Sequence, residues 1–248
     1  MVDFEIAVLA DIHGNTWALK EVLKDIKKIG IMKIVNLGDS LYGPLDPAGT
    51  AEILIVEGID SISGNQDRVI VDNIDEPAVN PTLEFVRKEL DNRVFNWVKA
   101  QRDTMVLDDD YFLCHGTPTS DTDYLLEKVT PEGVKLRDSV ELDSRLKAIE
   151  QPVILCGHSH MQHVVYTSSG KWIVNPGSVG LPAYDDDLPY PHVMESGHPH
   201  ANYCVITAGK DGYYFRQAAV PYDWEAAAAC AQKNNRGDWA RWLRTGRV

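Results

Sequence analysis

Two histidines, one residue apart, close a short apolar run in the stretch "LCGHSH" at 155–160. In an extended chain, residues i and i+2 point to the same side, so His158 and His160 would aim at one place. Asp11 and His13 repeat this spacing after the apolar run at 6–10. Imidazole and carboxylate groups together suit Mn, Fe, Zn, Co or Ni. The alternative for each pair alone is a polar surface loop.

Other strand-like runs also end in glycine and polar residues, at Gly38-Asp39, Gly64-Asn65 and His115-Gly116. Ligand sites in open α/β sheets lie beyond the carboxyl ends of the strands, so we expect these side chains to meet. Each signal alone is typical of a turn, but their joint occurrence favours a site. Two Asp, one Asn and four His are too many ligands for one tetrahedral zinc. They suit two ions about 3.5–4 Å apart that share a bridging carboxylate.

The apolar pattern predicts the elements that position these residues. The first third reads as β-α-β-α-β, with parallel strands at 6–10, 33–38 and 59–63. Asn15 or Thr16 can cap the first helix, which ends at Gly30, and Asp46-Pro47 opens a second helix that stops at Gly58. Asn80-Pro81 opens a helix to about 101, 111–116 is a strand, and 121–150 is charged and mostly helical.

After residue 152 the pattern changes to short strands. They lie at 152–156, 163–168, 171–174, 202–207 and 212–218, and predict a second, mainly antiparallel sheet. Asp223 caps a helix, and 239–243 can form a last one. The expected fold class is α/β (α+β by some schemes), a four-layer α-β-β-α sandwich. We expect a single domain over 1–248, with an inserted loop at about 183–201 and a C-terminal helical extension at about 222–245.

Composition narrows the classes of protein. The chain has 248 residues, 44% of them hydrophobic, which is enough for one sizeable core. The net charge of −13 disfavours binding to nucleic acid or to an anionic membrane. Four scattered cysteines without a C-x-x-C predict reduced core thiols. The first ten residues do not form a signal peptide and no run has the length of a membrane span, so we expect a cytoplasmic protein.

The pattern D-x-H…G-D…G-N…H-G…G-H-x-H resembles that of the calcineurin-like metallophosphoesterases. The segments at 38–47, 115–126 and 175–182 look like the small bacterial and archaeal phosphodiesterase branch, and the likeness covers about 4–218. The resemblance implies the same four-layer fold of the metallophosphoesterase type. It also implies two divalent transition-metal ions per chain, with Mn favoured and Fe, Zn, Ni or Co open.

Carried over by position, the resemblance implies a role for each polar residue. Asp11, His13 and His160 would hold one metal; Asn65, His115 and His158 would hold the other; and Asp39 would bridge them. The implied reaction is dinuclear metal-dependent hydrolysis of phosphate esters, as a phosphodiesterase or phosphatase, by a metal-bridging hydroxide. Asp39, Asn65 and Asp67 are then the expected catalytic residues, with Asp67 supporting the ligands from behind. Asn175 and Ser178 either buttress the ligand loops or form a plain turn.

Gln66 departs from the family pattern. Many members read G-N-H-[DE], and the histidine is taken to protonate the leaving oxygen; here the motif is Gly64-Asn65-Gln66-Asp67. Glutamine can hydrogen-bond a phosphate oxygen but cannot give up a proton at neutral pH. We therefore expect Gln66 to bind substrate, and the enzyme to favour esters whose leaving group departs without a proton.

Two other functions stay open: a non-catalytic metal-binding scaffold of the same fold, and a nuclease, which the acidic balance disfavours. The expected partner is a small phosphate-ester substrate, with no nucleic acid and no membrane, and a homo-oligomer is left open. His192, His198 and His200 fall in a long segment, 184–203, that reads as a lid, a dimer contact or a solvated acidic loop.

Overall fold

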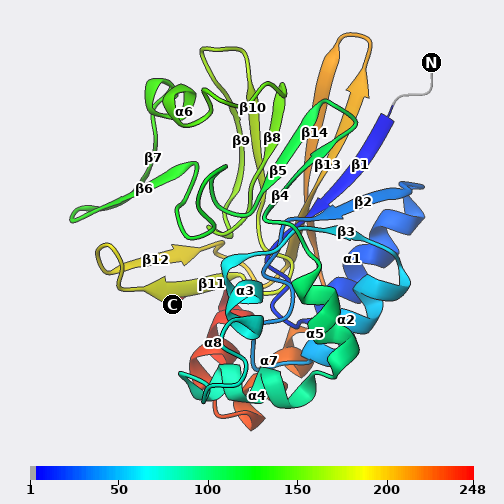
Figure 1. The fold of residues 1–248 in the computed structure, drawn as a ribbon, viewed down its shortest axis with the longest axis vertical. Coiled ribbons are helices and arrows are strands. Elements are labelled where there is room, and N and C mark those ends of the chain that lie inside the picture. Colours follow the sequence, from blue (N-terminus) through cyan, green and yellow to red (C-terminus); the bar gives the residue numbers. More distant parts are fainter. Residues whose placement is uncertain (1–3) are drawn as a thin grey trace.

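Two five-stranded sheets pack face to face in the computed structural model, which describes residues 4–248 (Figure 1). The first sheet has the order β14-β13-β1-β2-β3 and the second β4-β5-β8-β10-β9. The strands of the first sheet are β1 (Phe4–Leu9), β2 (Lys33–Asn36), β3 (Asp60–Ser61), β13 (Ala201–Gly209) and β14 (Gly212–Val220). Those of the second are β4 (Thr104–Leu107), β5 (Tyr111–Cys114), β8 (Val153–Leu155), β9 (Gln162–Tyr166) and β10 (Trp172–Pro176).

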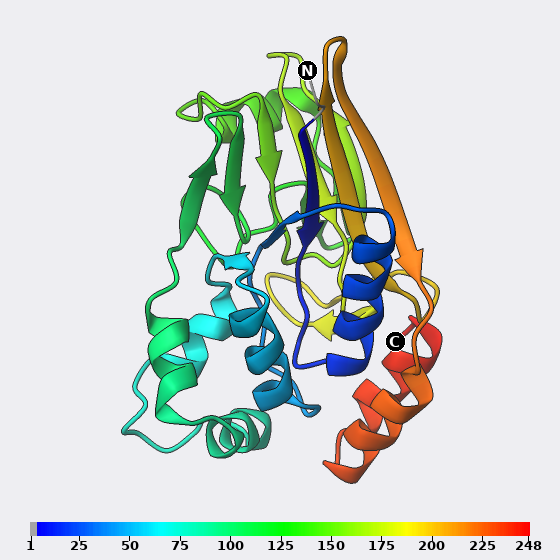
Figure 2. The same cartoon turned by 90° about the vertical axis from the view of Figure 1, so that its right-hand side faces the viewer.

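Helices lie outside both sheets and below their edge (Figures 1 and 2). They are α1 (Thr16–Lys28), α2 (Pro47–Val56), α3 (Asn65–Val71), α4 (Pro81–Glu89), α5 (Asn92–Lys99), α6 (Ser139–Arg145), α7 (Trp224–Lys233) and α8 (Gly237–Thr245). Two hairpins complete the chain: β6 (Glu127–Thr130) with β7 (Gly133–Leu136), and β11 (Ala183–Asp186) with β12 (His192–Glu195). The predicted α/β fold class is confirmed.

Strand alternation explains the layers. On β1, Ile6 and Val8 point to the core between the sheets, where they join Val153 and Leu155 of β8. Ala7 and Leu9 point to the opposite face and pack in the cluster that contains the buried residues of α1. Successive side chains of a strand face opposite sides, so the part of β1 from Ile6 to Leu9 is buried on both faces and is apolar, whereas Phe4 and Glu5 are exposed.

Capping fixes where the helices begin. The side chain of Asn15, not Thr16, accepts a hydrogen bond from the backbone N–H of Ala18 at the start of α1. Asp46 caps α2 and Asn80 caps α4, each followed by proline. The predicted helix from 81 to 101 is two helices, because Leu90 is extended and Asp91 caps α5.

Two predictions about the second half are wrong. The strands at 201–209 and 212–220 do not join the second sheet; β13 pairs antiparallel with β1, with Ile206 opposite Ile6. The second sheet is not mainly antiparallel, because β8 runs parallel to both β5 and β10. Alternation of apolar residues identifies a strand but does not predict which strand it pairs with. The edge of β1 that β2 leaves open therefore pairs with β13, which lies far along the chain.

The segment 121–150 is not mostly helical: it contains the hairpin β6–β7 and the short helix α6. The segment expected as an inserted loop, 183–201, contains the hairpin β11–β12, and the C-terminal extension forms α7 and α8. Residues 1–3 of the expected domain lie outside the described residues. Within 4–248, no helix has the length and apolar character needed to cross a membrane. The four cysteines are free thiols, and the cytoplasmic location stays a prediction.

Candidate metal centre

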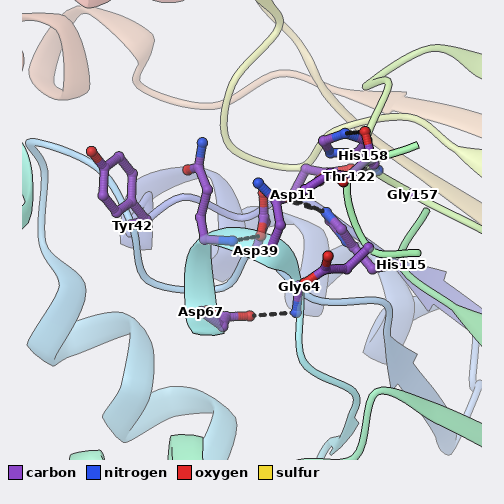
Figure 3. Close-up of polar contacts among 12 residues, drawn as sticks. Asp11, Asp39, Tyr42, Gly64, Asp67, His115, Thr122, Gly157 and His158 are labelled. Carbon is purple, nitrogen blue, oxygen red and sulfur yellow. Dashed lines mark hydrogen bonds and ion pairs between the residues drawn. The ribbon is translucent and has the colours of Figure 1, made fainter. Parts of the chain in front are cut away.

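All seven predicted metal ligands lie beyond the carboxyl ends of strands and converge there. Figure 3 labels Asp11, Asp39, His115 and His158 among them. They come from the loop after β1 (Asp11, His13), the loop after β2 (Asp39), the first residue of α3 (Asn65), the loop after β5 (His115) and the loop after β8 (His158, His160). Their donor atoms form two clusters, Asp11–His13–His160 and Asp39–His115–His158, with atoms in each cluster within 4.8 Å of one another. Asn65 adjoins the second cluster.

The first cluster presents free lone pairs to one point. Nδ1 of His13 donates to the carbonyl oxygen of Tyr42 at 2.8 Å, and Nδ1 of His160 donates to that of Leu181 at 2.7 Å. Both Nε2 atoms are therefore unprotonated in the neutral rings, yet they lie 3.1 Å apart. Oδ1 of Asp11 is buried without a hydrogen-bond partner, 3.6 Å from Nε2 of His160. Converging lone pairs and an unpartnered carboxylate oxygen fit a cation.

The second cluster also directs its donor atoms to one place. Nδ1 of His115 donates to the carbonyl oxygen of Leu37, and its Nε2 faces Oδ1 of Asn65 at 3.1 Å and Oδ2 of Asp39 at 3.4 Å. His158 uses the other nitrogen: Nε2 donates to the carbonyl oxygen of Thr122, which leaves Nδ1 for the site. Backbone carbonyls thus set the tautomer of every histidine in both clusters, as is usual around bound metals.

The backbone that carries these ligands is not extended. Five of them have positive φ angles, between 52° and 69°: Asp11, His13, Asp39, His158 and His160. Asp, Asn and His tolerate this left-handed region better than most residues. The two histidines of "GHSH" therefore do not converge by strand alternation, as the sequence suggested. They belong to loop backbone, and each joins a different cluster.

Burial shifts the titration of the ligands before any ion binds. It lowers the pKa of His13 and His160, and that of His158 to about 4, so these imidazoles are neutral at neutral pH. Burial also lowers the pKa of His115, but the carboxylates of Asp39 and Asp11 outweigh it and raise the net value to about 10. A cation that enters the second cluster must displace this proton, so binding there releases H⁺.

Asp67 does not line the cavity but connects two loops behind it. Its carboxylate accepts hydrogen bonds from the backbone N–H groups of Ser40, Leu41 and Gly64. These bonds hold the loop after β2, which carries Asp39, against the start of α3, which carries Asn65. Figure 3 shows the bond from Gly64. Asp67 therefore lies behind the candidate ligands, and its contribution to catalysis stays a prediction.

Asn175 and Ser178 are also in contact with the ligand loops. Nδ2 of Asn175 donates to the carbonyl oxygen of Gly157, and Oγ of Ser178 donates at 2.7 Å to that of Asp11. Both side chains are buried. Asn175 also closes the turn, since its Oδ1 accepts a hydrogen bond from the backbone N–H of Gly177. Both alternatives of the sequence are therefore present at this residue.

A cavity of about 230 Å³ opens over the clusters, and its lining includes five aromatic or basic side chains that had not been singled out from the sequence. They are Tyr42, Tyr184, Arg236, Trp239 and Trp242, and Gln66 lines it as well. The edge of Trp239 meets the ring of His13 at a centroid distance of 5.8 Å. Three of the five come from the C-terminal extension, where helical periodicity alone gives no sign of a distant site.

The three loop histidines have different surroundings. His192 is buried, and its Nε2 accepts a hydrogen bond from the hydroxyl of Tyr124, whose ring contacts that of His158 at a tilt of 38°. His198 and His200 contact each other, and His200 contacts Trp224; neither lines the cavity over the clusters. The segment is therefore a folded hairpin against the site rather than a solvated loop.

Comparison with known proteins agrees with this geometry. The sequence model of the "Calcineurin-like phosphoesterase superfamily domain" matches residues 4–204. The chain is 25% identical over 264 residues to "Uncharacterized protein MJ0912" of Methanocaldococcus jannaschii, covering 96% of each. Its structure is similar to a metallophosphoesterase from Sphaerobacter thermophilus (TM-score 0.74, 21% identity, 98% of this chain and 99% of that one). It is also similar to the hypothetical protein PH1004 from Pyrococcus horikoshii OT3 (TM-score 0.73, 18% identity, 98% of both chains).

Proposed function

We propose that this chain, which belongs to the calcineurin-like phosphoesterase superfamily and is a phosphoric ester hydrolase, uses two divalent transition-metal ions. Its proposed substrates are small phosphate esters. The observation that carries the proposal is the pair of facing Nε2 atoms of His13 and His160, 3.1 Å apart and both without a proton. Two lone pairs at this distance repel each other, and a shared cation removes the repulsion.

The proposed ligands follow the two clusters. Asp11, His13 and His160 hold one ion; Asn65, His115 and His158 hold the other. Asp39 is the proposed bridge: its Oδ2 lies in the second cluster, and it is buried at the floor of the cavity. Imidazole, carboxylate and amide ligands together suit Mn, Fe, Zn, Ni and Co. Of these, we propose Mn because of the resemblance to the family.

Bound ions would supply positive charge to the phosphoryl oxygens and lower the pKa of a water, which makes a nucleophile at neutral pH. The chain supplies the rest. Backbone carbonyls orient the histidine rings, and the hydrogen bonds of Asp67 fix the position of Asp39 relative to Asn65. Arg236 is the only Lys or Arg side chain among those that line the cavity within the described chain, and Asp238 and Thr82 orient its guanidinium. It can bind a phosphate oxygen.

Metal stoichiometry tests the proposal. We expect two ions per chain after dialysis against Mn, measured by elemental analysis, and loss of hydrolysis on chelation that returns when metal is added back. His160→Ala should lose one ion, because it removes one of three ligands of the first cluster. His200→Ala is the control, since this ring contacts His198 and Trp224 outside the cavity, and it should keep both ions. One ion in the unaltered protein would contradict the dinuclear site.

Leaving-group preference tests the role of Gln66. Its backbone N–H donates to Oδ1 of Asp39, and its side-chain oxygen is buried without a partner, beside the cavity. It offers no proton, and general acid help is typically worth about 10²–10⁴-fold. We therefore expect faster hydrolysis of aryl than of alkyl esters, and only a small loss in Gln66→Ala on aryl esters.

The matched variant is Gln66→His, which restores the residue type of the wider family. It should raise the alkyl-to-aryl rate ratio, with an added pH dependence. If Gln66→Ala lowers aryl turnover strongly and in a pH-dependent way, Gln66 does more than orient the substrate.

A further inference from the structure

A second cavity of about 660 Å³ adjoins the metal centre. Asn65 and His158, predicted ligands of one cluster, line both this cavity and the metal cavity, so the two spaces meet at the second cluster. Its other walls come from the hairpin β6–β7, the end of α6, and the segments 122–124 and 186–189. A substrate whose scissile phosphate lies at the metals can extend into it.

Three cationic side chains from this region line the second cavity: Lys128, Arg137 and Arg145. Lys128 is paired with Glu141 at 2.6 Å. The two arginines have only distant partners, since Arg137 lies 3.8 Å from Glu141 and Arg145 lies 4.0 Å from Asp123. The sequence shows no cluster of Lys and Arg here; the turn between β7 and α6 brings them together.

Arg137 is the cationic side chain of this wall that most needs a partner. Its side chain is only 12% exposed, and its Nε is buried without a hydrogen-bond partner. Burial and the charge of Arg145 both lower its pKa. A buried guanidinium N–H without an acceptor is costly, and a second cation nearby adds to the cost. An anion in the cavity would relieve both.

The acidic groups that line the cavity do not meet this need. Asp123 is 60% exposed, and Asp186 is also exposed, so both carboxylates lie at the solvent rim. Glu127 is buried, but its carboxylate accepts a hydrogen bond from Ser159, and burial raises its pKa to about 7. It is therefore partly neutral at physiological pH. Arg137 is therefore the most buried charged group without a close partner in this wall, and Arg145, 32% exposed, lies between it and the acidic rim.

We propose that the second cavity binds a second phosphate group of the substrate through Arg137 and Arg145, while the scissile phosphate lies at the metal centre. This inference rests on the proposed function and names its substrate class: small phosphate esters that carry another phosphoryl group. The planar guanidinium groups can each bind two oxygens of such a group. The net charge of −13 otherwise disfavours a dianionic substrate, so selective binding needs a local cationic wall.

Two esters that differ only in the second phosphate test the inference. They are thymidine 5′-(p-nitrophenyl phosphate) and the same ester with a 3′-phosphate. We expect the unaltered enzyme to have the lower KM for the second ester. In Arg137→Gln this preference, the ratio of the two KM values, should fall about 10-fold to 100-fold, as for the loss of a charge-assisted hydrogen bond. Arg137→Lys keeps the charge but not the planar fork and should lose less.

Lys135→Gln is the matched control, because Lys135 lies on the same hairpin but is exposed and does not line this cavity. It should keep the preference. Thermal unfolding of each variant establishes that it is folded. If Arg137→Gln and Lys135→Gln change the ratio alike, or if the unaltered enzyme has no preference, the inference is wrong while the proposed hydrolysis stands.

Calorimetric binding of thymidine 3′,5′-bisphosphate separates the two proposals further. If no ester is hydrolysed with any metal, the proposed function fails. Binding of this ligand that is weakened in Arg137→Gln and kept in Lys135→Gln would still support the subsite. Equal binding by all three proteins would overturn it.

Discussion

Asp39→Asn is expected to lower turnover with saturating metal by at least about 10²–10³-fold, the loss typical of removing a group that stabilises transition-state charge. Oδ2 of Asp39 lies 3.4 Å from Nε2 of His115, and its Oδ1 accepts a hydrogen bond from the backbone of Gln66. Asparagine has the same size and keeps an oxygen for that bond. It removes the negative charge that two ions would share.

The fold should survive this change, because Asp39 lies in a loop and contributes no apolar packing. Circular dichroism and thermal unfolding test this point, and elemental analysis tests the metal content. Asp60→Asn is the matched control: it removes the same charge from a surface ion pair with Lys33 and should leave turnover unchanged. Turnover of the metal-loaded Asp39→Asn variant near that of the unaltered enzyme would refute the bridging role.

Gly180→Ala is expected to destabilise the protein by about 3 kcal/mol or more, at the upper end of the cost of overpacking a core. A Cβ at this position would overlap the carbonyl oxygen of Ile12 and lie 2.5 Å from its carbonyl carbon. This atom is backbone between Asp11 and His13, so it cannot move aside without moving both ligands. Denaturant unfolding should show the loss, and metal affinity should fall with it.

Gly237→Ala is the matched control. The nearest atom to a Cβ there is the end of the Gln232 side chain at 3.5 Å, and the residue is the first of α8. Alanine favours a helix over glycine, so this variant should be as stable as the unaltered protein or slightly more stable. If Gly180→Ala unfolds at the same denaturant concentration as Gly237→Ala, the prediction is wrong. The loop after β1 can then move to make room for the added Cβ.

The convergence of the candidate ligands could be predicted from the sequence, because parallel strands of one sheet bring their carboxyl ends to one edge. The role of these residues as metal ligands stays a proposal. Asp39 and His115 follow strands of different sheets and still lie in one cluster. The local geometry was predicted less well. Convergence of His158 and His160 follows from left-handed loop backbone rather than from the two-residue period of a strand.

The rest depends on contacts between distant segments. The pairing of β13 with β1 joins residues about 200 positions apart, and the sequence of neither strand predicts its partner. The segment 121–150 reads as helical because its charged residues mask the alternation of β6 and β7. Arg137, Arg145 and Arg236 look like ordinary surface charges in the sequence, and only the folded chain places them beside cavities.

The left-handed backbone at five of the proposed ligands also bears on how such a protein changes over generations. Each non-glycine residue in this region costs roughly 1 kcal/mol relative to ordinary backbone. Replacing any of these five residues by glycine would relieve that strain and remove a ligand at the same time. Selection for stability alone would therefore erode the centre one position after another. A duplicated copy that is no longer selected for hydrolysis could become more stable by losing these ligands, and with them the metals. A copy that is selected for turnover must keep the less stable backbone.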